Sequence, residues 1–215
     1  MDHRYGREAG FVASERLCCS SPPSVSSVHR HPSCPVTIWT IGHSTRSIEE
    51  LLGVLGVHGI ETVVDVRRFP GSRRLPQFGS SALESALTAQ GVGYRWIGEL
   101  GGRRQPNPDS PNDAWQHAAF RGYADHMATE EFATGLFELE MIASSSATAI
   151  MCAEALWWRC HRRLIADALT ALGYEVRHIR DASEAEVHRL APPAALVDGA
   201  LTYASPQPQI ELGLE

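Results

Sequence analysis

The sequence contains no lysine, because all 19 of its basic residues are arginine. This absence excludes three kinds of chemistry that need a lysine amine. They are a Schiff-base nucleophile, a pyridoxal-phosphate anchor and a phosphate-binding loop of the Walker type. If the protein binds anions through cationic side chains, those side chains are therefore arginines.

Long apolar runs are also missing. No segment approaches the length that crosses a membrane, and the first residues lack the uninterrupted apolar region of a secretory signal. The chain has five cysteines, an odd number that favours reduced thiols over a disulfide framework. We therefore expect a cytoplasmic protein with no membrane partner.

The charge of the chain is unevenly distributed. A formal net charge of -6 argues against a nonspecific polybasic nucleic-acid binder. An acidic body with one arginine-rich edge is nevertheless suited to binding an anion, including a phosphate backbone. Three short segments hold the clustered arginines, which are Arg67, Arg68, Arg73, Arg74, Arg103, Arg104, Arg159, Arg162 and Arg163.

The length of 215 residues predicts a single well-buried core. Residues 1–35 are rich in Ser, Pro, His and Arg and have no period, so we expect a flexible leader there. Residues 36–204 should form one α/β domain, and residues 205–215 a C-terminal tail. The residues after 180 are expected to form a short helix before that tail.

Within residues 36–204, β-rich runs alternate with helical patterns. This alternation predicts parallel β-α units in a single three-layer, Rossmann-like α/β domain, whose mainly parallel sheet has about five strands. The expected strands cover residues 36–41, 60–66, 94–100, 147–151 and 175–179.

Residues 151–163 concentrate reactive groups at the end of the fourth expected strand. They include Cys152, Glu154, Cys160 and His161, followed by a helical pattern. Ligands of open α/β sheets bind at the carboxyl ends of the strands. A helix start also offers free N–H groups that favour anions and lower the pKa of thiols.

Two other expected strands also end in polar groups. His43 and Ser44 follow the first strand, and Asp65 with Arg67 follows the second. One such residue alone is more typical of a turn or a structural hydrogen bond. Three strand ends that deliver polar groups to one edge of a sheet predict a functional pocket.

The cysteines allow two further interpretations. Cys152 followed by Arg159 resembles the thiolate-plus-arginine loops of tyrosine phosphatases and rhodaneses, but with a longer spacing than those loops use. Cys152, Cys160 and His161 are also zinc-ligand types. Their spacing is not a recognised ligand pattern, and adjacent Cys160 and His161 at a helix start should point in different directions. We therefore expect no metal and no cofactor.

Trp157 and Trp158 precede the helix in a polar loop, where large aromatic side chains are costly to expose. They are expected either to cover the edge of the core or to stack on an extruded base.

Several short motifs occur together along the chain. They are Thr40-Ile41-Gly42-His43-Ser44, Asp65-Val66-Arg67 with Pro70 and Ser72, Gln77-Phe78, Leu100-Gly101-Gly102, Tyr123 with Met127, and Cys152-x-Glu154 leading to Cys160-His161-Arg162. Together these motifs resemble the "domain of unknown function 488" family, over roughly residues 36–179. The loop 155–159 departs from the polar, proline-containing loop of many relatives, so the resemblance does not carry over a function specific to that loop.

The resemblance implies a DNA-base-processing enzyme of glycosylase type that removes a modified base such as 5-hydroxymethyluracil. The residues are compatible with this chemistry, since Asp65 or Glu154 can assist a water and His43 or His161 can hydrogen-bond the leaving base. DNA is the expected partner, held through its phosphates and an extruded base. The expected substrate-binding residues are Ser44, Arg67, Ser72, Arg73, Gly101, Gly102, Arg103, Tyr123, Cys152, Trp157, Trp158, Cys160 and Arg162.

Two alternatives stay open at the level of sequence. One is a thiolate enzyme that uses Cys152, and the other is a non-catalytic nucleic-acid or nucleotide-binding module. Replacing Cys152 with Ser should abolish thiolate chemistry, whereas Asp65→Asn and Glu154→Gln should abolish glycosylase chemistry. The sequence does not assign separate roles to His43, Asp65, Glu154 and His161.

Overall fold

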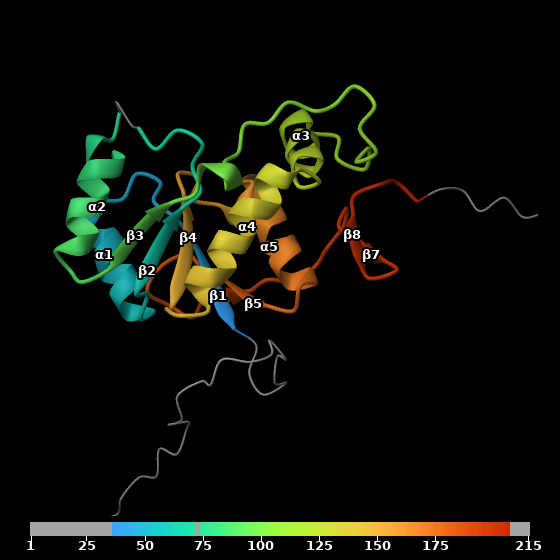
Figure 1. The fold of residues 1–215 in the computed structure, drawn as a ribbon. Coiled ribbons are helices and arrows are strands. Elements are labelled where there is room, and N and C mark those ends of the chain that lie inside the picture. The colour runs from blue at the N-terminus through green and yellow to red at the C-terminus, as the bar shows by residue number, and fades with distance from the viewer. Residues whose placement is uncertain (1–35, 72–73, 207–215) are drawn as a thin grey trace, which may run out of the picture. The chain divides into compact units, whose positions relative to one another are not determined.

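The structure is a computed structural model and describes residues 36–71 and 74–206. Within these residues the core element is a six-stranded sheet in the order β3-β2-β4-β1-β5-β6 (Figure 1). β6 pairs antiparallel with β5, and the other pairings are parallel. The strands are β1 (Thr37–Gly42), β2 (Thr62–Asp65), β3 (Gly93–Trp96), β4 (Thr148–Cys152), β5 (Glu175–Ile179) and β6 (Glu186–Val187).

Helices connect the parallel strands. The first of them begins with a capping box, in which the Glu50 amide donates to the Ser47 hydroxyl (3.1 Å) and the Ser47 amide donates to the Glu50 carboxylate (2.7 Å). The helices are α1 (Ile48–Val57), α2 (Ser80–Thr88), α3 (Ala118–His126), α4 (Glu130–Ala143) and α5 (Arg162–Ala171), with short 3-10 helices η1 (Pro76–Phe78), η2 (Gly98–Leu100) and η3 (Trp157–Arg159).

The sheet is covered on both faces. Adjacent residues of β2 point to opposite sides: Val63 packs in the core cluster that includes α1 and α2, and Val64 packs in the cluster that includes α4 and α5. Both side chains are fully buried. The expected three-layer, mainly parallel α/β fold is therefore confirmed.

The connections place a crevice beside β4. The chain leaves β2 through α2, on one face of the sheet, whereas it leaves β4 through α5, on the other face. Because β2 and β4 are neighbours, their connections diverge at their carboxyl ends. Such a divergence opens the crevice in which open α/β sheets bind ligands.

Two sequence predictions of local structure are wrong. The third strand ends at Trp96 and is followed by η2, rather than continuing to residue 100. The region after residue 180 forms β6 and a hairpin of β7 (Ala195–Val197) and β8 (Ala200–Thr202), instead of a short helix. Asp198 and Gly199 form the hairpin turn, and both have the positive φ that an Asp-Gly turn favours.

No helix in the described part of the chain combines the length and apolarity needed to cross a membrane. The predicted leader over residues 1–35, positions 207–215 of the predicted tail, and Ser72 and Arg73 lie outside the described residues.

Candidate functional site

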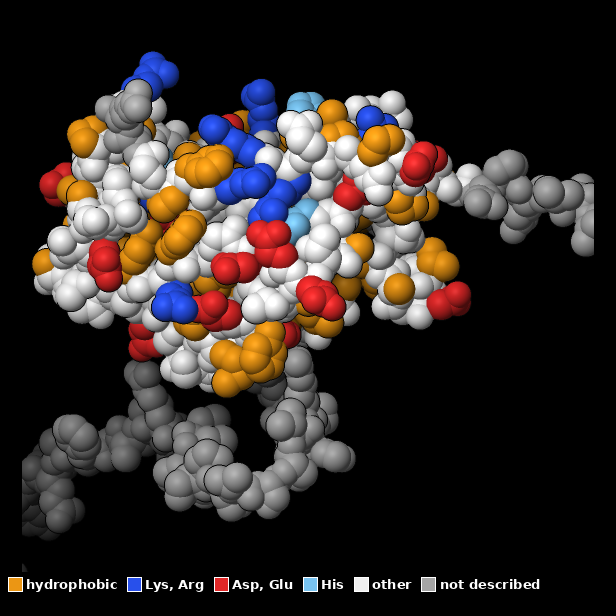
Figure 2. Space-filling model, turned by 45° about the horizontal axis from the view of Figure 1, so that its top comes forward, with side chains coloured by type: hydrophobic (Ala, Val, Ile, Leu, Met, Phe, Trp, Pro, Cys, Tyr) orange, Lys and Arg blue, Asp and Glu red, His pale blue; other side chains and the backbone are white. Residues whose placement is uncertain are grey.

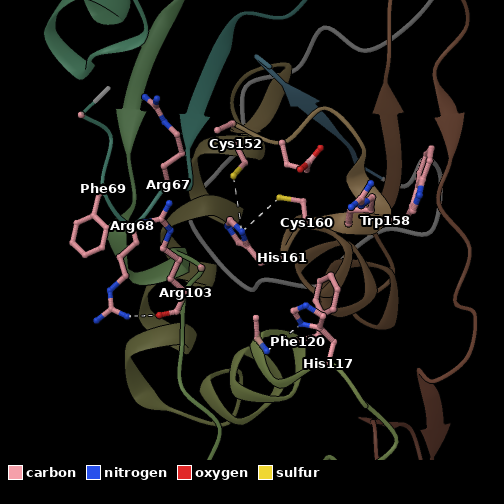
Figure 3. A pocket seen from close by; sticks show the side chains of 16 residues that line it. Arg67, Arg68, Phe69, Arg103, His117, Phe120, Cys152, Trp158, Cys160 and His161 are labelled. Atoms are coloured by element: carbon pink, nitrogen blue, oxygen red, sulfur yellow. Dashed lines mark hydrogen bonds between the residues drawn. The ribbon is translucent and has the colours of Figure 1, made fainter. Parts of the chain in front are cut away.

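A cavity of about 700 Å³ lies at the carboxyl ends of β2 and β4 (Figure 3). Its wall comes from the loop after β2, the segment that leads into α3, and the loop between β4 and α5. The cavity therefore occupies the crevice that the diverging connections create. The predicted site residues on its wall are Arg67, Gly102, Arg103, Cys152, Glu154, Trp158, Cys160 and His161.

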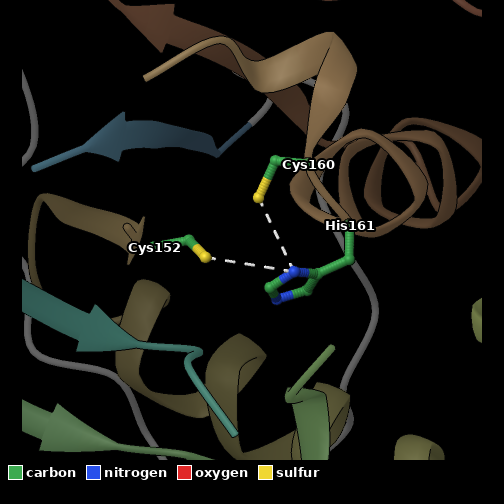
Figure 4. A group of neighbouring side chains, drawn as sticks. All are labelled: Cys152, Cys160 and His161. Carbon is green, nitrogen blue, oxygen red and sulfur yellow. Dashed lines mark hydrogen bonds between the residues drawn. The ribbon is translucent and has the colours of Figure 1, made fainter. Parts of the chain in front are cut away.

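Two thiols meet one imidazole at the base of this cavity (Figure 4). His161 Nδ1 lies 4.0 Å from Cys152 Sγ and 3.6 Å from Cys160 Sγ. The other ring nitrogen, Nε2, lies 2.9 Å from the Val66 carbonyl oxygen and must donate to it. When the ring is neutral, Nδ1 presents its lone pair to both thiols.

The expectation that Cys160 and His161 point in different directions is wrong. Cys160 has an extended backbone (φ -123°, ψ 152°), whereas His161 is already helical (φ -57°, ψ -17°). The angular separation of side chains that two successive helical residues would have therefore does not apply to Cys160 and His161. This change of backbone conformation lets the Cys160 thiol lie beside the His161 ring.

The two thiols differ in acidity. The hydrogen bond with Cys152, and then the nearby His161 and Arg162, hold the pKa of Cys160 well below its usual range. The same hydrogen bond and burial raise the pKa of Cys152 well above that range. Within this coupled pair, thiolate character is therefore favoured at Cys160 over Cys152.

Arg162 was expected to bind substrate, but its side chain is buried behind the cavity wall. Its Nε donates to Cys160 Sγ (3.4 Å), and its Nη2 donates to the carbonyl oxygens of Glu154 and Ala155. Arg162 thus fixes the loop between β4 and α5 and stabilises negative charge on Cys160.

Asp65 is enclosed and does not reach the cavity. Its carboxylate accepts from the Arg67 amide (3.0 Å), from Arg67 Nε (2.8 Å) and from the Tyr94 hydroxyl (2.9 Å). Burial and the Asp65 carboxylate raise the pKa of Tyr94. Because its oxygens already have donors, Asp65 is placed as the counterion that orients Arg67 rather than as a group that meets a substrate.

His43 also lies behind the cavity wall and is only 3% exposed. Nδ1 donates to the Ser44 carbonyl oxygen (2.9 Å), Nε2 accepts from Arg67 Nη1 (3.3 Å), and the ring stacks on Phe78 at 4.1 Å. Burial, and then the nearby Arg67, lower the pKa of His43 to about 4. The neutral ring therefore supports Arg67 and has no nitrogen left for a substrate.

Four more predicted residues lie off the cavity wall. Tyr123 is buried and donates to the Leu100 carbonyl oxygen (2.8 Å). Trp157 stacks on His178 at 3.9 Å, so one face of its ring is already covered. Ser44 joins the β1 end to the β4 loop through its amide, which donates to the Ala153 carbonyl oxygen (2.9 Å). Gly101 is buried and packs on the Arg68 backbone.

The cavity is strongly cationic. Its wall contains four arginines, Arg67, Arg68, Arg103 and Arg159, and a single carboxylate, Glu154. Within the described part of the chain, no carboxylate pairs with Arg103 or Arg159. Figure 2 shows arginine side chains gathered on one face of the molecule, beside a histidine and next to a group of acidic side chains.

A family model matches residues 47–169 of the chain, more than half of its length. That family is described as "Domain of unknown function DUF488". The chain belongs to the DUF488 family. The matched range includes every residue on the cavity wall. Comparisons with curated proteins and with solved structures gave no match.

Some wall residues of the DUF488 domain were not predicted as site residues. Arg68 and Arg159 belong to the arginine clusters, so their sequence signal was present. His117 and Phe120 reach the cavity because the long segment between η2 and α3 loops back to place the start of α3 there (Figure 1), which no local pattern shows. The wall residues that were not predicted are Arg68, Phe69, Gly71, His117, Ala119, Phe120, Ala153 and Arg159.

Proposed function

We propose that this DUF488 protein is a DNA-base-processing enzyme of glycosylase type. It would hydrolyse the N-glycosidic bond of a modified base such as 5-hydroxymethyluracil. The observation that carries the proposal is the position of Glu154, an exposed carboxylate and the single one on the wall of a cavity whose lining includes four arginines and several aromatic rings. A carboxylate in such a site stabilises the positive charge that develops on a sugar when its bond to the base breaks.

The arginines support binding of a phosphate backbone. Arg103 and Arg159 have no acidic partner among the described residues, and Arg68 donates to the Arg103 carbonyl oxygen (2.9 Å). Guanidinium groups are well suited to phosphate because they donate in a planar fork. The local positive charge lets an acidic protein bind DNA at this one face.

Aromatic side chains support binding of an extruded base. Phe69 is 64% exposed and Trp158 is 39% exposed, and both line the cavity together with Phe120. Exposed aromatic rings are unfavourable in water, and sites for flipped bases use them as stacking surfaces. The cavity volume of about 700 Å³ is within the range of small-molecule sites.

The reaction uses Glu154 and water. Glu154 accepts a proton from the water while the oxygen of that water forms a bond to C1′ of the sugar. The C1′–N bond breaks, and its electron pair leaves on the base. His117 Nδ1 accepts from the Ala119 amide (3.3 Å), so Nε2 of the neutral ring carries hydrogen. It can hydrogen-bond the departing base, which takes a proton from solvent. His117 thus fills the role that the sequence gave to His43 or His161.

The test is incubation with oligonucleotides that carry damaged or modified bases, followed by mass analysis of released bases. Glu154→Gln should lower the rate of base release by roughly a hundredfold or more. Glu184→Gln, which replaces an exposed carboxylate off the cavity wall, is the matched control and should leave the rate unchanged. Full activity of Glu154→Gln, or no release from any substrate, would contradict the proposal. Salt-dependent binding without product would indicate a binding module instead.

A second candidate is a thiolate enzyme, which the lowered pKa of Cys160 favours. In that case Cys160→Ser should abolish activity on a phosphoester or a sulfur donor, while Glu154→Gln retains it. The product distinguishes the two candidates directly, because only a glycosylase releases a free base.

A further inference from the structure

We propose that Cys152, Cys160 and His161 bind a divalent ion of the zinc class, with one coordination position open to the cavity. Their three ligand atoms, two Sγ and one Nδ1, lie within 4.8 Å of one another. The site does not depend on the glycosylase proposal, because it follows from these ligands alone. It also reverses the expectation from sequence spacing that the chain has no metal site.

The distances are close to those that zinc needs. With Zn–S near 2.3 Å and Zn–N near 2.0 Å, a tetrahedral ion holds sulfur and nitrogen roughly 3.6 Å apart. Here the two S···N distances are 3.6 Å and 4.0 Å. The same geometry separates two sulfurs by about 3.8 Å. Rotations of the cysteine side chains that move each sulfur by less than about 1 Å would bring the atoms to these separations.

The surroundings already orient the ligands. Nε2 of His161 donates to the Val66 carbonyl oxygen (2.9 Å), which leaves Nδ1 as the free ligand atom. Metal-binding histidines characteristically donate their other ring nitrogen to such an acceptor. Arg162 Nε donates to Cys160 Sγ (3.4 Å) and favours a thiolate there. Two thiolates and one neutral imidazole would match the charge of a divalent ion.

Gly102 keeps the space beside the ligand nitrogen open. A Cβ at this position would lie 2.7 Å from His161 Nδ1. All three ligand residues also line the cavity (Figure 3), so the fourth position of a tetrahedral ion would face the cavity rather than packed protein. Three protein ligands with an open position are typical of catalytic rather than structural zinc, and the open position takes a water.

The experiment uses the full chain carrying Cys18→Ser, Cys19→Ser and Cys34→Ser, so that Cys152 and Cys160 are its only thiols. Metal content is measured after purification, and the reduced apoprotein is then titrated with Co²⁺ and with Zn²⁺. We expect one ion per chain and a thiolate-to-cobalt charge-transfer band with the intensity of two sulfur ligands. Zn²⁺ should displace the cobalt and abolish the band.

Single variants then assign the ligands. Cys152→Ser, Cys160→Ser and His161→Gln should each weaken Zn²⁺ affinity at least about a hundredfold, because even loss of a supporting hydrogen bond to a ligand costs tenfold to a hundredfold. His58→Gln, which replaces a half-buried histidine off the cavity wall, is the matched control and should bind as the parent does. Circular dichroism shows whether each variant is folded.

Three results would overturn the site. The first is that the parent protein, which keeps Cys152 and Cys160, binds neither ion. This result can be interpreted without any ligand variant. The second is a cobalt spectrum without sulfur ligation, and the third is parent-like affinity in folded ligand variants. Ligand variants that lose the metal but release bases at the parent rate would support the metal site. They would also show that the glycosylase reaction does not need it.

Discussion

At the scale of single residues, the arginines differ in whether their charge is already neutralised. Arg67 pairs with buried Asp65, and Arg104 pairs with Glu131 at 2.8 Å. Arg103 and Arg159 line the cavity without an acidic partner in the described ranges. An unpaired guanidinium is free to replace the counterions of a phosphate, whereas a paired one must first give up its carboxylate.

If the protein binds DNA as proposed, the unpaired arginines should therefore carry the salt dependence of that binding. Arg103→Ala and Arg159→Ala should each lower affinity and reduce the slope of log affinity against log salt by about one. Arg95→Ala is the control, because Arg95 pairs with Glu138 at the edge strand β3 and lies off the cavity wall. Fluorescence anisotropy over a range of NaCl concentrations measures the slope. An unchanged slope in both cavity variants would show that DNA does not contact this face.

His43 should make stability depend on pH. Its pKa is lowered from 6.5 to about 4 in the folded protein, so between these values the unfolded state binds the proton and the folded state does not. The contribution of His43 to the free energy of unfolding is therefore fully present above pH 6.5. It is lost as the pH falls toward 4, and the loss is at most about 3 kcal/mol. His43→Gln should flatten this part of the curve. Urea unfolding between pH 4 and 7 measures it, with His58→Gln, at a half-buried histidine off the cavity wall, as the control.

At the scale of elements, the end of β1 supports the loop that carries Glu154. The His43 and Ser44 amides donate to the carbonyl oxygens of Cys152 and Ala153 (both 2.9 Å). Gly42 makes this contact close, because a Cβ there would overlap the Glu154 carbonyl oxygen. Two connections far apart in sequence therefore hold one another in place.

Gly42→Ala should displace that loop and lower base release by at least about tenfold, since a shift of about 1 Å in a reacting group costs up to a hundredfold. Gly53→Ala is the matched control, because Gly53 lies exposed in α1 with nothing within 4 Å of its added Cβ. That control should keep its activity and gain roughly 0.5–1 kcal/mol of stability. Kinetics on the same oligonucleotide would contradict the prediction if Gly42→Ala matched the control.

The C-terminal hairpin is joined to the domain by a buried polar chain. The Tyr203 hydroxyl donates to Asp167 (2.9 Å), whose other oxygen accepts from His188 (2.9 Å), and His188 in turn accepts from His178 (3.0 Å). The Thr40 hydroxyl completes the chain at 2.7 Å from His178. Burial, and then the nearby His188 and Arg162, lower the pKa of His178 to about 2, which keeps this ring neutral.

Tyr203→Phe removes only the terminal donor of that chain. It leaves an oxygen of buried Asp167 without its partner, so we expect a loss of about 1–3 kcal/mol in the free energy of unfolding. Urea denaturation measures the change, and limited proteolysis around residues 195–203 should show faster cleavage. Parent-like stability would mean that the hairpin is held by its apolar contacts instead.

At the scale of the whole molecule, the absence of lysine limits the chemistry that the proposed glycosylase could perform after base release. Lysine imines are the usual route by which glycosylases go on to cut the abasic strand. We expect this protein to leave the abasic strand intact until it is treated with alkali. Gel analysis with and without alkali tests the expectation, and enzyme-dependent strand cleavage without alkali would contradict it.

The sequence predicted the layered fold and one edge of the cavity because both follow from local patterns. Alternating strands and helices determined the parallel sheet, and strand ends brought Arg67, Cys152 and Glu154 to one edge. Burial was not predictable in the same way. Asp65 and His43 also follow strand ends, yet Asp65 pairs with Arg67 beneath the surface, and His43 lies under Phe78. His117 was missed because its position depends on the path of a long segment.

The two edges of the sheet differ in how they end the hydrogen-bonding ladder. Antiparallel β6 is only two residues long, and β3 presents the charged pair of Arg95 with Glu138 at its side. Short strands and charged side chains at an edge discourage pairing with a strand from another molecule. Concentrated solutions of the folded protein should therefore resist growth of intermolecular β-structure, even though the interior of its sheet is rich in β-branched residues.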